Sequence, residues 1–209
     1  MRFKGLKWPR LVSSIAVLFP IVLTTLAFGA DKTTFQAKPA DQYPNKQVSE
    51  GVTIAAEPFI TDDQTKDAFG KLNPWRYDIL PVLVVIRNDS QNAIRLEKLH
   101  FEYELPDHSK VNATPAADVK YDKGPSRPKA AIGPLGGVKV GGGKNPLNVP
   151  EIEIRGFSAK MLPPGETASG FIYFETDITS AGSALYITGL QNASTGKDLY
   201  YFEIPLSGK

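Results

Sequence analysis

The chain has 209 residues, with 24 Lys and Arg against 22 Asp and Glu, and it contains no cysteine. The lack of cysteine excludes disulfides, thiolate metal sites and cysteine nucleophiles. Four basic residues and no acidic residue lie within the first 30, so the remainder carries 20 basic against 22 acidic residues, a net charge of −2. This balance argues against a nucleic-acid-binding protein, which would show a basic face.

Residues 1–30 have the pattern of a secretory leader. Basic residues near the start precede an apolar run over 11–28, and small residues follow at positions 27, 29 and 30. This order is typical of a signal peptide, and we expect cleavage near residue 29 or 30. An uncleaved signal anchor stays open, because the stretch approaches the length of about 20 residues that spans a bilayer. Either interpretation predicts a periplasmic or secreted protein, and a lipid anchor is not expected without a cysteine.

Residues 31–50 are polar, carry two prolines and offer few large apolar side chains for burial. We predict a flexible N-terminal arm or tether over this range. Residues 51–209 then suit a single domain with a sizeable core.

The domain opens with a strand and a short helix. Apolar residues alternate with their neighbours over 52–56, the period of a strand, and Pro58 ends it. Residues 61–69 predict a short helix with Thr61 or Asp62 as N-cap and Gly70 just beyond its end.

The strongest core signal is the apolar, β-branched run over 79–86, which predicts a central strand. Residues 88–92 form a turn by composition, and 93–105 resume as a strand whose period slips between Leu96 and Leu99. We interpret the slip as a β-bulge, with a helix over 95–100 as the alternative. A further turn leads to a short strand near Val111.

Glycine, proline and lysine dominate residues 124–148, which predict a long loop. A phosphate-binding loop is not favoured, because Val138 and Asn145 stand where that motif needs glycine and a hydroxyl residue. Beyond the loop, we favour a short helix over a strand for 150–160. Strands are then expected over 168–176, 184–190 and 199–206, with a turn at 192–197 closing a terminal hairpin.

Many short strands with few helices predict an all-β, mainly antiparallel fold. Two segments carry a resemblance: an apolar strand ending in an Asn-x-Ser turn over 82–90, and a Pro-Gly-Glu turn feeding a strand over 162–174. Together they resemble immunoglobulin-like β-sandwich domains of bacterial exported proteins of unknown function. The resemblance implies one such sandwich with one or two short helices and a long Gly/Pro-rich loop. It also implies a binding or scaffolding role and carries over no catalytic residue.

Two clusters of polar residues contain the side-chain types that bind metals. His100 and His108 lie near Glu102, Glu104 and Asp107, so an oxygen-and-imidazole site is conceivable, but alternation along a strand explains them as a solvated face. The acids at 62, 63 and 67 do not follow the spacing of a calcium loop, and two of them suit a helix N-terminus. We therefore expect no metal and no cofactor.

Aromatic residues concentrate in the last strands. Phe171, Tyr173 and Tyr201, with their neighbours, suggest a carbohydrate-stacking platform, although filling the two faces of buried strands is the commoner role. The candidate interaction surface comprises Lys139, Lys144, Tyr173 and Tyr201.

These features favour an exported, non-enzymatic binding or structural module of the cell envelope. Its expected partner is a protein or another envelope component, without nucleic acid, and with a membrane only through an uncleaved leader. The alternative is a carbohydrate-binding accessory or a hydrolase with a site under the 124–148 loop. A pocket of convergent polar groups would favour the enzyme, and a filled core with aromatic surface left over would favour the module.

Overall fold

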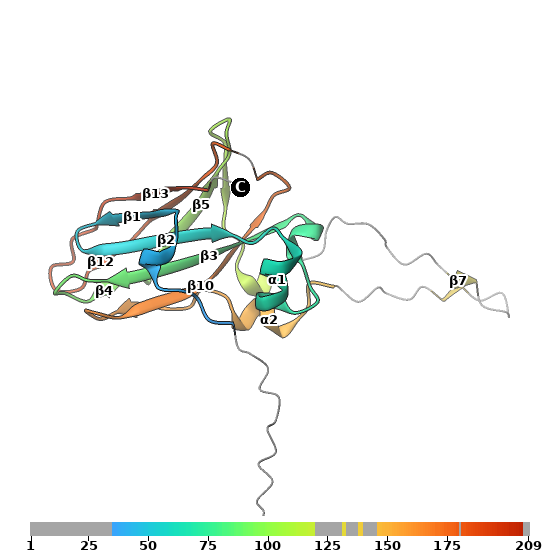
Figure 1. Ribbon diagram of the computed structural model, residues 1–209, viewed down its shortest axis with the longest axis horizontal. Coiled ribbons are helices and arrows are strands. Elements are labelled where there is room, and N and C mark those ends of the chain that lie inside the picture. The colour runs from blue at the N-terminus through green and yellow to red at the C-terminus, as the bar shows by residue number, and fades with distance from the viewer. Residues whose placement is uncertain (1–34, 120–130, 133–137, 140–145, 180, 207–209) are drawn as a thin grey trace, which may run out of the picture. The chain divides into compact units, whose positions relative to one another are not determined.

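Strand β3 (Ile79–Asn88) occupies the centre of the fold, as its apolar run predicts. In the computed structural model, which describes residues 35–119, 131–132, 138–139, 146–179 and 181–206, nine of its ten residues are buried. The first sheet has the order β1-β2-β3-β10, and each neighbouring pair is antiparallel (Figure 1). The other strands of this sheet are β1 (Lys46–Ser49), β2 (Val52–Pro58) and β10 (Thr167–Glu175).

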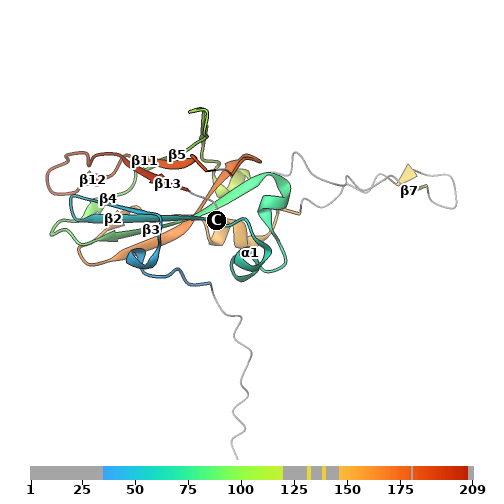
Figure 2. The ribbon, with the colours of Figure 1, turned by 45° about the horizontal axis from the view of Figure 1, so that its top comes forward.

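The second sheet is a separate antiparallel layer with the order β13-β11-β5-β6. Figure 2 shows β5, β11 and β13 as a layer above β2 and β3. The members of this sheet are β5 (His100–Glu104), β6 (Lys110–Asn112), β11 (Ala184–Thr188) and β13 (Phe202–Pro205). The fold is therefore all-β and mainly antiparallel, as the sequence predicts.

Short elements complete the described part of the chain. A small sheet has the order β12-β4-β9, and β7 pairs with β8. The small strands are β4 (Ile94–Arg95), β7 (Ala131–Ile132), β8 (Val138–Lys139), β9 (Met161–Leu162) and β12 (Gln191–Asn192). The helices are α1 (Asp62–Phe69) and α2 (Pro150–Ile154), with 3-10 turns η1 (Ala40–Gln42), η2 (Pro74–Tyr77) and η3 (Ala116–Asp118).

Helix α1 forms where the sequence predicts it, because its end signals are local. The Thr61 side chain accepts a hydrogen bond from the Gln64 backbone N–H, and Gln64 Oε1 accepts one from the Thr61 backbone N–H. Gly70 ends the helix at a φ of 69°. Helix α2 likewise agrees with the helix favoured for 150–160.

Two hydrophobic clusters lie on the two faces of the first sheet. Leu80, Val82, Val84 and Ile86 of β3 join side chains of the second sheet between the layers. The alternate residues of β3 pack on the opposite face with side chains from η1, α1 and α2. Because both faces are covered, β3 reads as a continuous apolar run instead of an alternating one.

The expectation of a flexible arm over 31–50 is wrong for the residues that the structure describes. Ala40 and Tyr43 are buried, and β1 pairs with β2 along its length. Phe35 packs against Phe59 and Phe171, with ring centroids 5.8 and 5.5 Å apart. Two aromatic side chains and backbone pairing anchor this otherwise polar segment. Residues 31–34, like the predicted leader, lie outside the described residues.

The bulged strand predicted over 93–105 is also wrong, because the segment crosses between sheets. Strand β4 pairs with β9 and β12, whereas β5 pairs with β11 and β6. The slip of the period marks a turn, in which the Leu99 N–H donates to the Leu96 carbonyl at 3.2 Å. Gly189 lies against this turn with a φ of 85°, and a Cβ at position 189 would lie 1.8 Å from the Lys98 carbonyl oxygen.

Both edges of the first sheet and the outer edge of β13 are covered. The Glu203 N–H of β13 donates to Gln47 Oε1 of β1 at 2.7 Å. On the far edge, Phe171 exchanges backbone bonds with Arg155 and Phe157. A Cβ on Gly170 would lie 2.5 Å from the Phe157 Cα, so glycine permits this approach. These contacts limit pairing with another strand at the edges of β1, β10 and β13.

We expect Gly189→Ala to destabilise the fold much more than Gly196→Ala. Both glycines have positive φ, but the Cβ at 196 meets nothing within 4 Å. Gly196→Ala should cost about 1–2 kcal/mol from backbone strain alone, and Gly189→Ala at least about 3 kcal/mol or the folded state itself. Urea unfolding measures both, and equal losses would contradict the close approach at Lys98.

The buried Asn88 side chain should be more important to stability than its exposed neighbour Asn92. Asn88 Nδ2 donates to the carbonyls of Asn92 and Leu162 at 2.8 and 2.9 Å, and its Oδ1 accepts from Ser90. Asn88→Ala leaves a buried Leu162 carbonyl without this donor, at a cost of about 1–3 kcal/mol. Asn92→Ala, the control, should stay within about 0.5 kcal/mol in urea unfolding. A neutral Asn88→Ala would refute the role of this network.

Candidate binding face

The outer face of the second sheet carries the polar and aromatic side chains that alternation turns away from the core. Phe101 and Tyr103 of β5 point into the core, so His100, Glu102 and Glu104 lie on the outer face, as predicted. On β11, Leu185 and Ile187 are buried, so Tyr186 and Thr188 lie on the outer face, next to the polar residues of β5. The register sets Tyr186 opposite Glu102 on one side and Glu203 on the other.

Four side chains form a row across this face, which we call the tyrosine ladder: Glu102, Lys110, Tyr186 and Tyr201. Lys110 Nζ donates to Glu102 Oε2 at 3.0 Å and lies 4.0 Å from the centre of the Tyr186 ring. The Tyr186 and Tyr201 rings stack with centroids 5.0 Å apart and an angle of 28° between their planes. The row thus joins side chains from β6, β5 and β11 to Tyr201 just before β13.

The ladder holds an exposed aromatic ring in a defined orientation. Lys110 and Tyr201 reach Tyr186 from opposite sides of β11, because β5 and β6 lie on one side of it and β13 on the other. Tyr201 remains 50% exposed. The hydrogen bond from Lys110 lowers the pKa of Glu102, and the same bond raises the pKa of Lys110. Both groups are therefore charged across the ordinary pH range, which preserves the cation–π contact.

The two histidines pair with carboxylates on this open face. His108 Nδ1 lies 2.8 Å from Glu104 Oε1, and His100 Nε2 lies 3.6 Å from Glu102 Oε1. Their side chains are 86% and 56% exposed. Within the described ranges, no group of three or more His, Asp or Glu side chains is arranged to hold a metal ion. These histidines do not sit in a cleft beside buried carboxylates, which is the arrangement that a hydrolase would favour.

The four residues predicted to form an interaction surface differ in what the structure shows of them. Tyr201 lies on the outer face. Tyr173 is wrong as a surface residue, because it is 1% exposed and donates its hydroxyl to the Ile152 carbonyl at 2.8 Å. This burial raises its pKa. Lys139 belongs to β8, whose side chains are not described, and Lys144 lies outside the described residues.

Tyr173 was misplaced because its cover comes from elsewhere in the chain. It lies on the face of the first sheet that packs with α1 and α2, together with Phe171. Neither helix could be positioned over β10 from the sequence pattern. Phe174 and Phe202 are buried in the other cluster, between the sheets, so most of the predicted aromatic set fills the core.

Tyr186 and Lys110 are not among the site residues predicted from the sequence. The signal was available in part, since Tyr186 sits between the apolar Leu185 and Ile187 and so belongs to the opposite face of its strand. Its contact with Lys110 depends on the strand order β11-β5-β6, which no local pattern gives.

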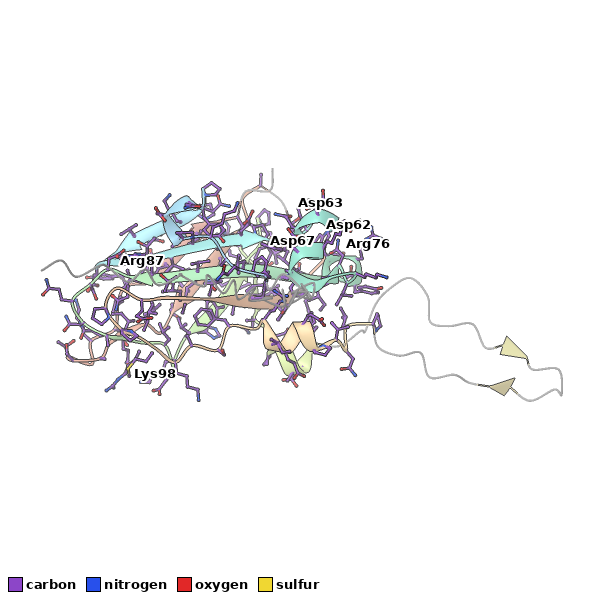
Figure 3. All side chains as sticks on the ribbon, turned by 60° about the horizontal axis from the view of Figure 1, so that its bottom comes forward. Asp62, Asp63, Asp67, Arg76, Arg87 and Lys98 are labelled. Atoms are coloured by element: carbon purple, nitrogen blue, oxygen red, sulfur yellow. The ribbon has the colours of Figure 1, made fainter. Side chains whose placement is uncertain are left out.

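Among the hollows that the described residues form, two lie away from the tyrosine ladder. The first has a volume of about 400 Å³ and lies beside α1 and η2. At its rim, Asp62 accepts hydrogen bonds from Asn73 and Arg76, and the bond from Asn73, followed by that from Arg76, lowers the Asp62 pKa. Figure 3 shows Asp62, Asp63 and Asp67 around α1 with Arg76 beside them. The aspartate therefore already has partners in the fold.

The second hollow, of about 240 Å³, lies where residues 116–119 meet residues 147–153. Leu147 and Asn148 in its lining belong to the 124–148 loop, under which the enzyme alternative places its site. Its lining is Ala116, Ala117, Val119, Leu147, Asn148, Val149, Ile152 and Glu153.

Comparison with known proteins gives distant similarities in structure alone. No protein-family model matches the chain, and no curated protein matches it significantly. A presumed lipoprotein (ycdA) of Bacillus subtilis is similar over 77% of this chain, at 10% identity and a TM-score of 0.37, and the match spans 38% of that protein's length. A structural-genomics target, SoR45, is similar over 76% of this chain and 87% of its own, at 14% identity and a TM-score of 0.34. Similarities of this size assign no function to the chain.

In the part of the chain that the structure describes, no helix has both the length and the apolar character needed to cross a bilayer.

We expect His108 to titrate at higher pH in the wild type than in Glu104→Gln. The hydrogen bond and charge of Glu104 raise the His108 pKa above its ordinary value of about 6.5. A raised folded-state pKa means that the pair stabilises the fold fully below the unfolded-state pKa, and that this contribution disappears as pH rises through the folded-state pKa. NMR titration of the imidazole protons measures the shift, and an unchanged midpoint in the variant would contradict the contact.

Proposed function

We propose that the chain is an exported, non-enzymatic binding module of the cell envelope, and that it binds its partner on the face carrying the tyrosine ladder. The observation that carries this proposal is Tyr201, which is half exposed although Phe171, Tyr173, Phe174 and Phe202 are all buried. An exposed ring fixed by its neighbours binds at a low cost in side-chain entropy.

The strand orders support an immunoglobulin-like sandwich as the scaffold of this module. The order β2-β3-β10 matches the A-B-E order of one immunoglobulin sheet, and β13-β11-β5 matches the G-F-C order of the other. The chain departs from antibody domains in lacking the cysteine pair between the sheets. We infer that the fold serves as a rigid support for the outer face of the second sheet.

Export is proposed from the leader pattern of residues 1–30. Expression of the full chain in a Gram-negative host should place the protein in the periplasm, with a mass that corresponds to cleavage near residue 29 or 30. An uncleaved product in the membrane fraction would support the signal anchor. A product of full mass in the cytosol would refute export.

The hydrolase alternative has weaker support. Among the described residues that line the 240 Å³ hollow, Glu153 is the one carboxylate, whereas glycoside hydrolysis commonly uses a pair. A binding face accounts better for the features that the described residues carry.

Photocrosslinking tests the proposed face. We expect p-benzoylphenylalanine at position 201 to form adducts with an envelope component, and these adducts should disappear when unlabelled protein is added in excess. The same probe at position 200 is the matched control, because Tyr200 is 70% exposed but contacts Lys197 instead of the ladder. Equal crosslinking from both positions, or none from position 201, would refute the proposed face.

A further inference from the structure

We propose that the tyrosine ladder is a stacking platform for a neutral polysaccharide. This inference rests on the proposed function and names the class of ligand. It moves the carbohydrate-binding alternative from the 124–148 loop to the open face of the second sheet.

The first argument is the shape of the aromatic site. The Tyr186 ring stacks on the Tyr201 ring, and Tyr201 is 50% exposed, so half of this residue is accessible to a ligand. Lys110 supports Tyr186 from the opposite side of β11. A sugar ring presents an apolar face of C–H groups, which packs on an aromatic ring, while its hydroxyls stay at the rim. A ring held in place is suited to this contact because it need not be ordered on binding.

The second argument is the set of hydrogen-bonding groups beside the rings. The register places Glu203 and Glu102 on the two sides of Tyr186, and Thr188 opposite His100 in the next row. Carboxylate oxygens accept hydrogen bonds from sugar hydroxyls, and the threonine hydroxyl both donates and accepts. Apolar rings flanked by such groups match the alternating apolar and hydroxyl surfaces of a saccharide.

The third argument concerns charge. Glu102 pairs with Lys110 and His100, and Glu104 pairs with His108. Lys110 offsets the charge of Glu102, whereas the two histidines are charged only when protonated, so Glu104 and Glu203 leave the face negatively charged when the histidines are neutral. This negative charge disfavours an acidic ligand, and it leaves carboxylate oxygens as acceptors for the hydroxyls of a neutral polyhydroxylated ligand.

The fourth argument is size. The ladder crosses from β6 to the start of β13, and three strand spacings of about 4.8 Å each give a span of about 14 Å. An open face of this width fits several linked sugar units, whereas a single sugar is usually enclosed in a pocket. The ligand is therefore inferred to be a polymer.

Sedimentation with three insoluble neutral polysaccharides, cellulose, chitin and curdlan, tests the proposal with the leaderless protein. We expect retention on at least one of them that changes little between 50 and about 500 mM salt, because the contact is not ionic. Tyr201→Ala should weaken this binding at least about tenfold, and Tyr201→Phe should restore most of what is lost. Tyr200→Ala, which removes an exposed ring outside the ladder, should bind within about twofold of the wild type. Circular dichroism and urea unfolding show that each variant is folded.

The outcomes separate this inference from the proposed function. No retention on any of the three polysaccharides, or equal retention of Tyr201→Ala and the wild type, overturns the inference. If the crosslinker at position 201 then captures a protein, the binding face stands and its ligand is that protein. If position 201 captures nothing, both proposals fail.

Discussion

The fold depends on one constraint, which is that strand β3 is buried on both faces. Nine of its ten residues are buried, and they alternate between the cluster shared with the second sheet and the cluster shared with the helices. Burying each aliphatic side chain contributes about 1.5–3 kcal/mol, so this strand requires a cover on each side. The second sheet supplies one cover, and η1, α1 and α2 supply the other. In the described residues, the outer face of the second sheet is then not needed to cover β3.

Local chemistry explains what the sequence could predict. Helix α1 has its cap, its capping box and its terminal glycine within ten residues. The length and the branched side chains of β3 likewise predict a buried strand. The crossing between β4 and β5 could not be predicted, because a turn and a bulge leave the same slip in the period. The choice between them depends on β11, which lies about 90 residues further along the chain and passes the crossing at Gly189. The prediction of a flexible arm was wrong for a similar reason. Phe35 packs against Phe59, just after β2, and against Phe171 of β10, and both lie far from it in the sequence.

The candidate site follows the same division between local and distant information. Tyr173 and Tyr201 look alike in the sequence, as aromatic residues near the ends of alternating strands. The structure separates them because α2 covers the face of the first sheet on which Tyr173 lies, while the outer face around Tyr201 has no such layer over it in the described residues. Strand alternation alone gives the face of a side chain. It does not tell which face is covered, and it does not bring Lys110 to Tyr186.

Contacts at the edges of β1, β10 and β13 accompany an ordered outer face on the second sheet. Sheet proteins expose edges that attract other strands, and here Gln47 covers the edge of β13 while residues 155–157 cover that of β10. For a partner that binds to side chains on a face, affinity depends on how little freedom those side chains lose. The tyrosine ladder meets that requirement, because Lys110 is held by Glu102, Tyr186 by Lys110, and Tyr201 by Tyr186. Since each contact is made by a different strand, the orientation of the exposed ring is set by the register of the whole sheet, so binding on this face is coupled to the integrity of the fold beneath it.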